Sequence, residues 1–362
     1  MMKKLFEFLF VYFRRQSIYR RFRRSVKEMM NTCELKPLTK EQKKEITDYY
    51  KRTLNKKPKL YWHQYYYSMN GDFSVKYIPN DLYFGRLQYA FYKDFVNQAY
   101  DDKNLYDVFF PDANQPSIIL KCANGHFYWE NNLIGRNKAI ELCANIPEAI
   151  IKPTFLSAGG ANVRYFSSKD GIDIKTGNTV EQVFSAYGRN FNIQEAIHQH
   201  EALKALNPSS VNTIRVVTYF RESEVVLLYA VMRIGESGSE VDNTTDGGYT
   251  CGILSDGKLK KEAYGFNPSR AYTVSQSSIT FDGYQLPCFD KVIETAKELH
   301  THVPQIPVVG WDLTVNDKEE VVFIEMNAPC GLHQSAAGPA FGDYTDEILE
   351  KAAFKKRFFL NW

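Results

Sequence analysis

The stretch GWDLTVNDKEEVVFIEMNAP at residues 310–329 places two carboxylates inside apolar segments. A polar segment separates its two β-type runs, and this pattern predicts a hairpin. With a loop at 317–320, Asp312 pairs directly with Glu325. Like charges opposed in a sheet destabilise it, and burying an unpaired carboxylate costs several kcal/mol more. The hairpin therefore needs either one neutral acid or a cation between the two.

Side-chain alternation puts Thr314, Phe323 and Asn327 on the face that carries both acids. Two carboxylates and an amide oxygen form an all-oxygen set that suits Mg²⁺ held jointly with phosphates. A surface hairpin with solvated acids is the alternative, although both faces of residues 321–326 are apolar. The pattern predicts a magnesium site whose protein ligands are Asp312, Glu325 and Asn327.

The distribution of cysteines indicates the redox compartment and the kinds of site that are expected. The six cysteines are scattered without a CxxC pair, which favours a reducing compartment and argues against a zinc site or a disulfide framework. A length of 362 residues suffices for one large domain or two to three smaller ones. We expect a cytoplasmic globular protein.

The first 27 residues carry an unusual charge. They hold nine Lys and Arg against Glu7 alone, a formal +8, so the rest of the chain is near −5 when the whole is +3. An acidic body with a basic arm is a poor nucleic-acid binder. The apolar run 5–13 is too short to span a bilayer, but aromatic residues beside arginines fit a helix lying on an anionic membrane surface. The alternative is a helix that packs on the body with its basic face exposed.

The order of helix and strand signals predicts an α+β chain with antiparallel sheets. Residues 1–57 look helical, and a tyrosine-rich segment at 58–100 gives no clear motif. Strands are expected at 117–122, 126–129, 149–153, 191–197, 213–220 and 225–234, and helices at 136–144, 180–187 and 290–300.

Further residues are suited to binding anions. Lys152 ends a buried strand and is followed by a loop that contains Ser157, Gly159 and Gly160, where backbone N–H groups can converge on a phosphate. An ordinary Gly-Gly turn has the same appearance. Arg215 and Arg233 lie in apolar strands, where each guanidinium needs an anion; phosphates or internal acidic partners would serve.

Taken together, these motifs resemble the ATP-grasp superfamily, in particular its branch associated with sugar transfer and surface-polysaccharide loci. The matching segments, in family order, are IIKP with its SAGG loop, QEAI, NPSSVNTIRVVTY, AVMRIG, VDN and GWD…EMNAP. The resemblance implies two α+β subdomains that clasp a nucleotide. It implies four regions: a basic helical region at 1–57, a segment packing on the core at 58–100, a small subdomain at 101–195 and a large subdomain with the metal site at 196–362.

The resemblance also implies roles for single residues, with ATP and Mg²⁺ as cofactors. The residues expected to bind the nucleotide are Lys103, Lys152, Ser157, Gly159, Gly160, Gln194, Glu195, Ala196, Ile197 and Glu201. Those expected to act on the phosphates are Arg215, Arg233 and Asn212, beside the metal ligands Asp312, Glu325 and Asn327.

The activity implied is that of a ligase, in which ATP converts a carboxylate into an acyl phosphate that an amine attacks. The family association suggests a substrate that is a surface polysaccharide or its precursor, near the inner face of the membrane. Two alternatives stay open: a phosphotransferase acting on a sugar hydroxyl, and a nucleotide-binding scaffold in glycan assembly.

Overall fold

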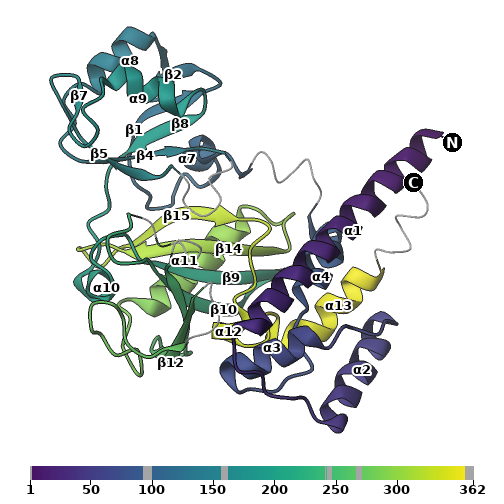
Figure 1. Ribbon diagram of the computed structural model, residues 1–362. Helices are drawn as coiled ribbons and strands as arrows, with labels where there is room; N and C mark the ends of the chain where they lie inside the picture. Colours follow the sequence, from purple (N-terminus) through teal and green to yellow (C-terminus); the bar gives the residue numbers. More distant parts are fainter. Residues whose placement is uncertain are drawn as a thin grey trace.

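Two antiparallel sheets form two bodies, one above the other in Figure 1. The computed structural model describes residues 2–92, 100–155, 162–240, 242, 247–265 and 271–354. The upper body contains a six-stranded sheet and the lower body a seven-stranded one, and helices cover both. The chain thus has the α+β architecture that the order of helix and strand signals predicts.

The small subdomain is built on the strand order β3-β2-β1-β8-β4-β5. Its core is formed by α8 and α9 packing on one face of this sheet, with buried residues such as Leu120, Phe184 and Ile193. The bounds are β1 Ile118–Ala123, β2 His126–Trp129, β3 Asn132–Ile134, α8 Arg136–Leu142, β4 Ala149–Pro153, β5 Arg164–Phe166, β6 Ser168–Lys169, β7 Ile172–Asp173, α9 Val180–Tyr187 and β8 Phe191–Gln194.

The strand expected at 191–197 is shorter than predicted. It ends at Gln194, and Glu195 donates its backbone N–H to the carbonyl of Ser117 at 2.9 Å. The apolar pair Ala196–Ile197 that suggested a longer strand instead lies in the connection to the large subdomain, half-buried.

The large subdomain has the strand order β13-β12-β11-β10-β9-β14-β15. The helix α11 packs on its central strands, and this contact forms the main hydrophobic core. The bounds are α10 Glu201–Leu206, β9 Thr213–Arg221, β10 Glu224–Ile234, β11 Tyr249–Ile253, β12 Leu259–Gly265, β13 Ala271–Tyr272, α11 Phe289–Thr301, β14 Val308–Val315, β15 Val321–Asn327, α12 Gln334–Ala337 and α13 Thr345–Phe354.

The hairpin of β14 and β15 pairs Asp312 with Glu325, the predicted register. Between that pair and the turn the register shifts by one residue, so Leu313 faces Phe323 and Val315 faces Val321. This β-bulge reverses the predicted side of Phe323. The ring packs with Trp311, at 6.0 Å between centroids, on the aromatic face away from the acids.

The N-terminal region packs on the large subdomain. Its bounds are α1 Met2–Asn31, α2 Lys40–Leu54, α3 Tyr61–Asn70, α4 Asn80–Leu82, a π-helical turn η1 Tyr83–Leu87 and α5 Gln88–Phe91. A 3₁₀ turn η2 Lys103–Leu105, which contacts β1 and β8, and the short helix α7 Tyr106–Phe109 follow before the small sheet begins. Several buried tyrosines of the N-terminal region donate their hydroxyl to a backbone carbonyl, whereas Tyr66 donates to the side chain of Asn80. Tyr50 donates to Tyr77, Tyr83 to Cys330 and Tyr92 to Val308, at 2.6–3.0 Å.

The second half of α1 packs on the body. Val26 is fully buried, Phe22 stacks on Phe84 at 4.6 Å, and the Tyr19 ring covers Gly85 so closely that a Cβ there would clash. Figure 1 shows the first turns of α1 extending beyond the rest of the chain. None of the helices in the described ranges combines the length and apolar character needed to cross a bilayer.

Candidate active site

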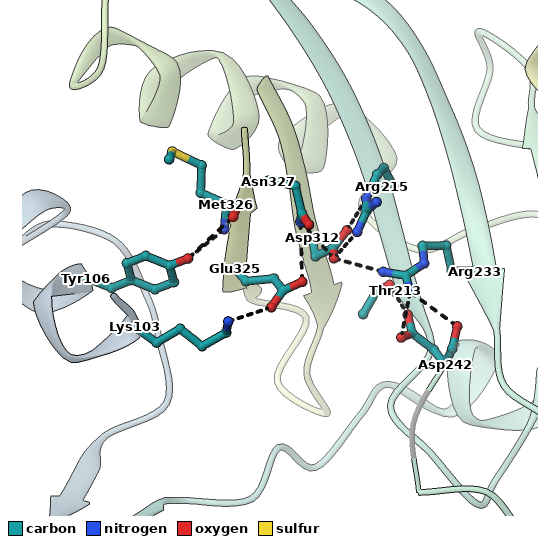
Figure 2. A network of polar contacts seen from close by, with 10 residues as sticks. All are labelled: Lys103, Tyr106, Thr213, Arg215, Arg233, Asp242, Asp312, Glu325, Met326 and Asn327. Atoms are coloured by element: carbon teal, nitrogen blue, oxygen red, sulfur yellow. Dashed lines mark hydrogen bonds and ion pairs between the residues drawn. The ribbon is translucent and has the colours of Figure 1, made fainter. Parts of the chain in front are cut away.

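The charged side chains of the large sheet gather on one face because the strand registers align them. Asp312 on β14 lies opposite Arg215 of β9 on one side and Glu325 of β15 on the other. Arg233 lies on the next strand, β10, where it pairs with Thr213 of β9. Figure 2 shows these side chains converging in a continuous polar network.

Asp312 is the centre of this network. It is 2% exposed and accepts from Arg215 Nε at 2.6 Å, while the second oxygen contacts Arg215 Nη2 and accepts from Arg233 Nη1 at 2.9 Å. Burial acts to raise the pKa of this carboxyl, but the two guanidinium charges outweigh it and hold the pKa at about 2. The acid is therefore ionised at neutral pH, and arginines supply the cation that the hairpin needs. Internal pairing, the alternative considered for both arginines, is what the structure shows.

A second acid, missed by sequence reasoning, completes the arginine pairing. Asp242 contacts Arg233 Nη2 at 3.3 Å through Oδ1 and accepts a hydrogen bond from the hydroxyl of Thr213. Burial raises the pKa of Asp242, and the Arg233 charge opposes that shift. Asp242 belongs to a loop after β10, so no strand periodicity marks it as a partner of Arg233.

Glu325 is the more accessible carboxylate, with 27% of its side chain exposed. Its partners are Lys103, at 3.3 Å between Nζ and Oε2, and the amide of Asn327, at 3.3 Å from Nδ2 to Oε1. The same amide nitrogen lies 3.2 Å from Asp312 Oδ2. Asn327 thus bridges the two acids.

The residues of this bridge fit a divalent cation. Within the described chain no three His, Cys, Asp or Glu side chains cluster as a ready metal site, so the amide must join the two carboxylates. The Asn327 amide already touches both, and turning it over exchanges its nitrogen for its oxygen. The three side chains then present the oxygen donors that Mg²⁺ prefers, with positions left for ligand phosphates.

Lys152 lies on the facing side of the site, on β4 of the small subdomain. It is 5% exposed, and its ammonium has no hydrogen bond or ion pair among the residues that the structure describes. Burial, helped by the nearby charge of Lys103, lowers the pKa of Lys152 to about 7, while Glu325 acts in the opposite direction. A buried lysine without a counter-ion is suited to receive an anion.

Comparison with protein families identifies the chain. A family model described as sugar-transfer associated ATP-grasp matches residues 101–340, well over half of the sequence. The chain belongs to this ATP-grasp family. Among curated proteins, none matches it.

Solved ATP-grasp ligases are similar at low sequence identity. The ligase PsnB with its minimal precursor, Mg and ADP is 13% identical, with a TM-score of 0.36, over 70% of this chain and 60% of that one. D-alanyl-alanine synthetase A from Vibrio cholerae O1 biovar eltor is 12% identical, with a TM-score of 0.40, and the match covers 72% of this chain and 63% of the synthetase. D-alanine–D-alanine ligase from Bacillus anthracis complexed with ATP is 13% identical, with a TM-score of 0.36, and the match covers 72% of this chain and 68% of the ligase. The chain spans about three fifths of the length of PsnB.

The remaining residues expected from the ATP-grasp resemblance differ in their burial. Gln194 is buried at the end of β8, whereas Glu195 and Glu201 are exposed and Ala196 and Ile197 are half-buried. The expected phosphate loop, with Ser157, Gly159 and Gly160, lies outside the described residues.

The side chain of Asn212 forms hydrogen bonds with the backbone of the fold. Its side chain is fully buried, and its amide nitrogen donates to the carbonyls of Leu203 and Asn207 at 2.9 and 2.8 Å. These bonds fix the end of α10 against the start of β9, so within the described contacts Asn212 does not reach the charged network.

Proposed function

We propose that this protein is an ATP- and Mg²⁺-dependent ligase that activates a carboxylate as an acyl phosphate for attack by an amine. The observation that carries the proposal is that Lys152 of one subdomain, unpaired within the described ranges, faces the Asp312–Glu325–Asn327 set on the other. A nucleotide triphosphate supplies the anions that the lysine lacks, and its metal ion is suited to the oxygen donors of Asp312, Glu325 and Asn327.

The steps follow from these charges. A carboxylate oxygen of the substrate attacks the terminal phosphorus of ATP, and ADP leaves with the electron pair of the broken P–O bond. An amine nitrogen then attacks the acyl carbon, phosphate leaves, and the nitrogen gives up a proton. Lys152 and Lys103 neutralise phosphate charge, and Arg215 and Arg233 face the terminal phosphate side. Bound Mg²⁺, held by Asp312, Glu325 and Asn327, would screen the charge of the phosphates.

The family description, sugar-transfer associated, supports a substrate in surface-polysaccharide assembly: a sugar acid, amino acid or peptide joined to a glycan or its precursor. The competing activities are transfer of phosphate to a sugar hydroxyl and nucleotide binding without turnover. The intact acids and Arg215 favour turnover over a scaffold.

An assay of ADP release across uronic acids, amino acids and uncharged sugars, with hydroxylamine in place of the amine, separates the activities. A ligase releases ADP only with a carboxylate and yields a hydroxamate, and Glu325→Gln should yield neither. Phosphorylation of an uncharged sugar without hydroxamate would establish the phosphotransferase instead. Absence of ADP release over the whole panel would contradict both enzymes.

We further propose that the basic arm attaches the protein to an anionic membrane surface. On the outward side of α1 the basic residues Arg20, Arg21, Arg24 and Lys27 are exposed, as is Phe13 at their N-terminal side. Each basic residue near an anionic leaflet contributes about 1 kcal/mol. Phe22 and Val26 face the body, so attachment rests on the exposed face and the first turns.

Removing residues 1–12 and changing Arg20, Arg21 and Arg24 to Glu should release the protein from anionic liposomes in a sedimentation assay. Added salt should weaken wild-type binding, and neutral liposomes should bind little. Retaining Phe22 and Val26 preserves the packing of α1. Undiminished binding of the altered protein would contradict the membrane role.

A further inference from the structure

Among the residues that the structure describes, an asparagine in the middle of the small sheet finds no partner for either of its polar atoms. Asn192 on β8 is 1% exposed, and within the described part of the chain neither Oδ1 nor Nδ2 makes a hydrogen bond. Buried amides in folded proteins almost always have at least one partner, since leaving both atoms unpaired costs free energy. Such a residue calls for a ligand that supplies the missing bonds.

Strand register fixes the position of Asn192 in the site. Lys121 of β1 and Lys152 of β4 both lie directly opposite it. Phe191 and Ile193 point into the small-subdomain core. Alternation therefore turns Asn192 toward the other face, together with Lys152 and Gln194. Asn192 thus lies between the lysine expected at the phosphates and the strand end expected at the base.

Other unpaired polar atoms surround this position. The turn η2 contacts β1 and β8, and there Asn104 donates Nδ2 to the carbonyl of Cys122 at 3.1 Å while its Oδ1 stays buried without a partner. The hydroxyl of Thr154, two residues after Lys152, is also buried and has no partner in the described part of the chain. With the Lys152 ammonium, these groups form a polar subsite, not a single misplaced side chain.

The donor and acceptor of the amide indicate which part of a nucleotide it contacts. A phosphate offers only acceptors, so it would satisfy Nδ2 and leave Oδ1 unpaired. The edge of adenine that carries the amino group offers a donor at N6 beside an acceptor at N7, the complement of an amide. Guanine presents acceptors at both O6 and N7, which leaves the amide oxygen without a donor.

We propose that Asn192 recognises the adenine base and sets the preference for ATP over GTP. The assignment rests on the proposed function, because it requires a nucleotide in the cleft. In it, Nδ2 donates to N7 and Oδ1 accepts from the N6 amino group, so both unpaired atoms gain partners on binding.

Asn192→Leu, of similar size, tests the assignment, with Asn190→Leu as its control. Asn190 lies just before β8, and its Oδ1 already accepts from the backbone N–H of Asn124 at 2.8 Å. Calorimetric titration of each full-length variant gives the dissociation constants for ATP and GTP, and urea unfolding gives the stability without nucleotide. Loss of the base contact should weaken ATP binding about tenfold or more and GTP binding less, because guanine can accept from Nδ2 but offers no donor to Oδ1 at this edge.

The stability measurement separates a ligand contact from a structural role. Asn192→Leu removes two unpaired polar atoms, so the nucleotide-free protein should be as stable as wild type or more so, whereas Asn190→Leu loses a hydrogen bond and should be less stable. Equal weakening of ATP and GTP, or destabilisation by Asn192→Leu with an unchanged ATP/GTP ratio, would overturn the assignment alone. Wild-type protein that binds neither nucleotide would overturn the proposed function as well.

Discussion

The large and small subdomains both present buried polar groups to the site, but these groups are paired on the large subdomain and unpaired within the described residues of the small one. On the large sheet, Asp312 is surrounded by Arg215, Arg233 and Asn327, and its charge is balanced before any ligand arrives. On the small sheet, Lys152 and Asn192 are just as buried but have no partner in the described structure. The polar groups of the large sheet are paired by folding, and we infer that those of the small sheet are paired by a bound ligand. The same kind of substitution should therefore have opposite effects on the two sides.

The largest effect on stability is expected for Arg215→Met. Removing one partner of a buried ion pair leaves the other charge uncompensated, which typically costs about 3–5 kcal/mol. Arg233 and Asn327 keep part of the balance at Asp312, so we expect a loss near the lower value. Urea unfolding measures it. A variant as stable as wild type would show that the pairing of Asp312 does not depend on Arg215.

The matched change on the small subdomain is Lys152→Met, and its effect should appear in binding. Losing a charged hydrogen bond to phosphate should weaken ATP about 10- to 100-fold and leave adenosine unaffected. Stability should stay constant or rise, because a buried unpaired charge is removed. Titration calorimetry with ATP, AMP and adenosine measures the first effect and urea unfolding the second. Equal losses for all three ligands would place Lys152 away from the phosphates.

The smallest effect is a change in proton uptake. Burial and Lys103 hold the pKa of Lys152 at about 7 without ligand, and phosphate beside the ammonium must raise it. At pH 8 the free lysine is mostly neutral, so ATP binding should take up nearly one proton; at pH 6 it is already charged and uptake should approach zero. Calorimetry in buffers of different ionisation enthalpy measures the uptake. Lys152→Met should abolish the difference, and an uptake independent of pH would contradict the assignment.

Short sequence patterns predicted much of this fold, because motifs and hairpins are each encoded by residues close together in the sequence. The resemblance to ATP-grasp proteins is confirmed, and the pairing of Asp312 with Glu325 follows from a turn and an alternating pattern within twenty residues. The side of Phe323 was wrong because a bulge inserts one residue between that pair and the turn, and β-type sequences do not mark where a bulge falls.

The partners of the charged residues could not be predicted in the same way. Asp242 reaches Arg233 from a loop whose path is set by the tertiary fold. The alternation of Asn192 with Phe191 and Ile193 is that of any strand with one solvated face, and only the structure reveals that its amide is buried without a partner among the described residues. Sequence reasoning finds charged side chains in apolar strands, but their counter-ions depend on contacts distant in sequence.

The bulge in β15 also makes the hairpin a convenient place for an insertion. The exposed turn after Asn316 is separated from the Asp312–Glu325 pair by the irregular register, which can absorb a change of length before it reaches the acids. Glu319 at the tip already adopts a left-handed conformation (φ 61°), so a short glycine-rich linker is compatible with the turn. A fluorescent reporter grafted between Lys318 and Glu319 would sit on the strand pair that carries the metal ligands without replacing any of them.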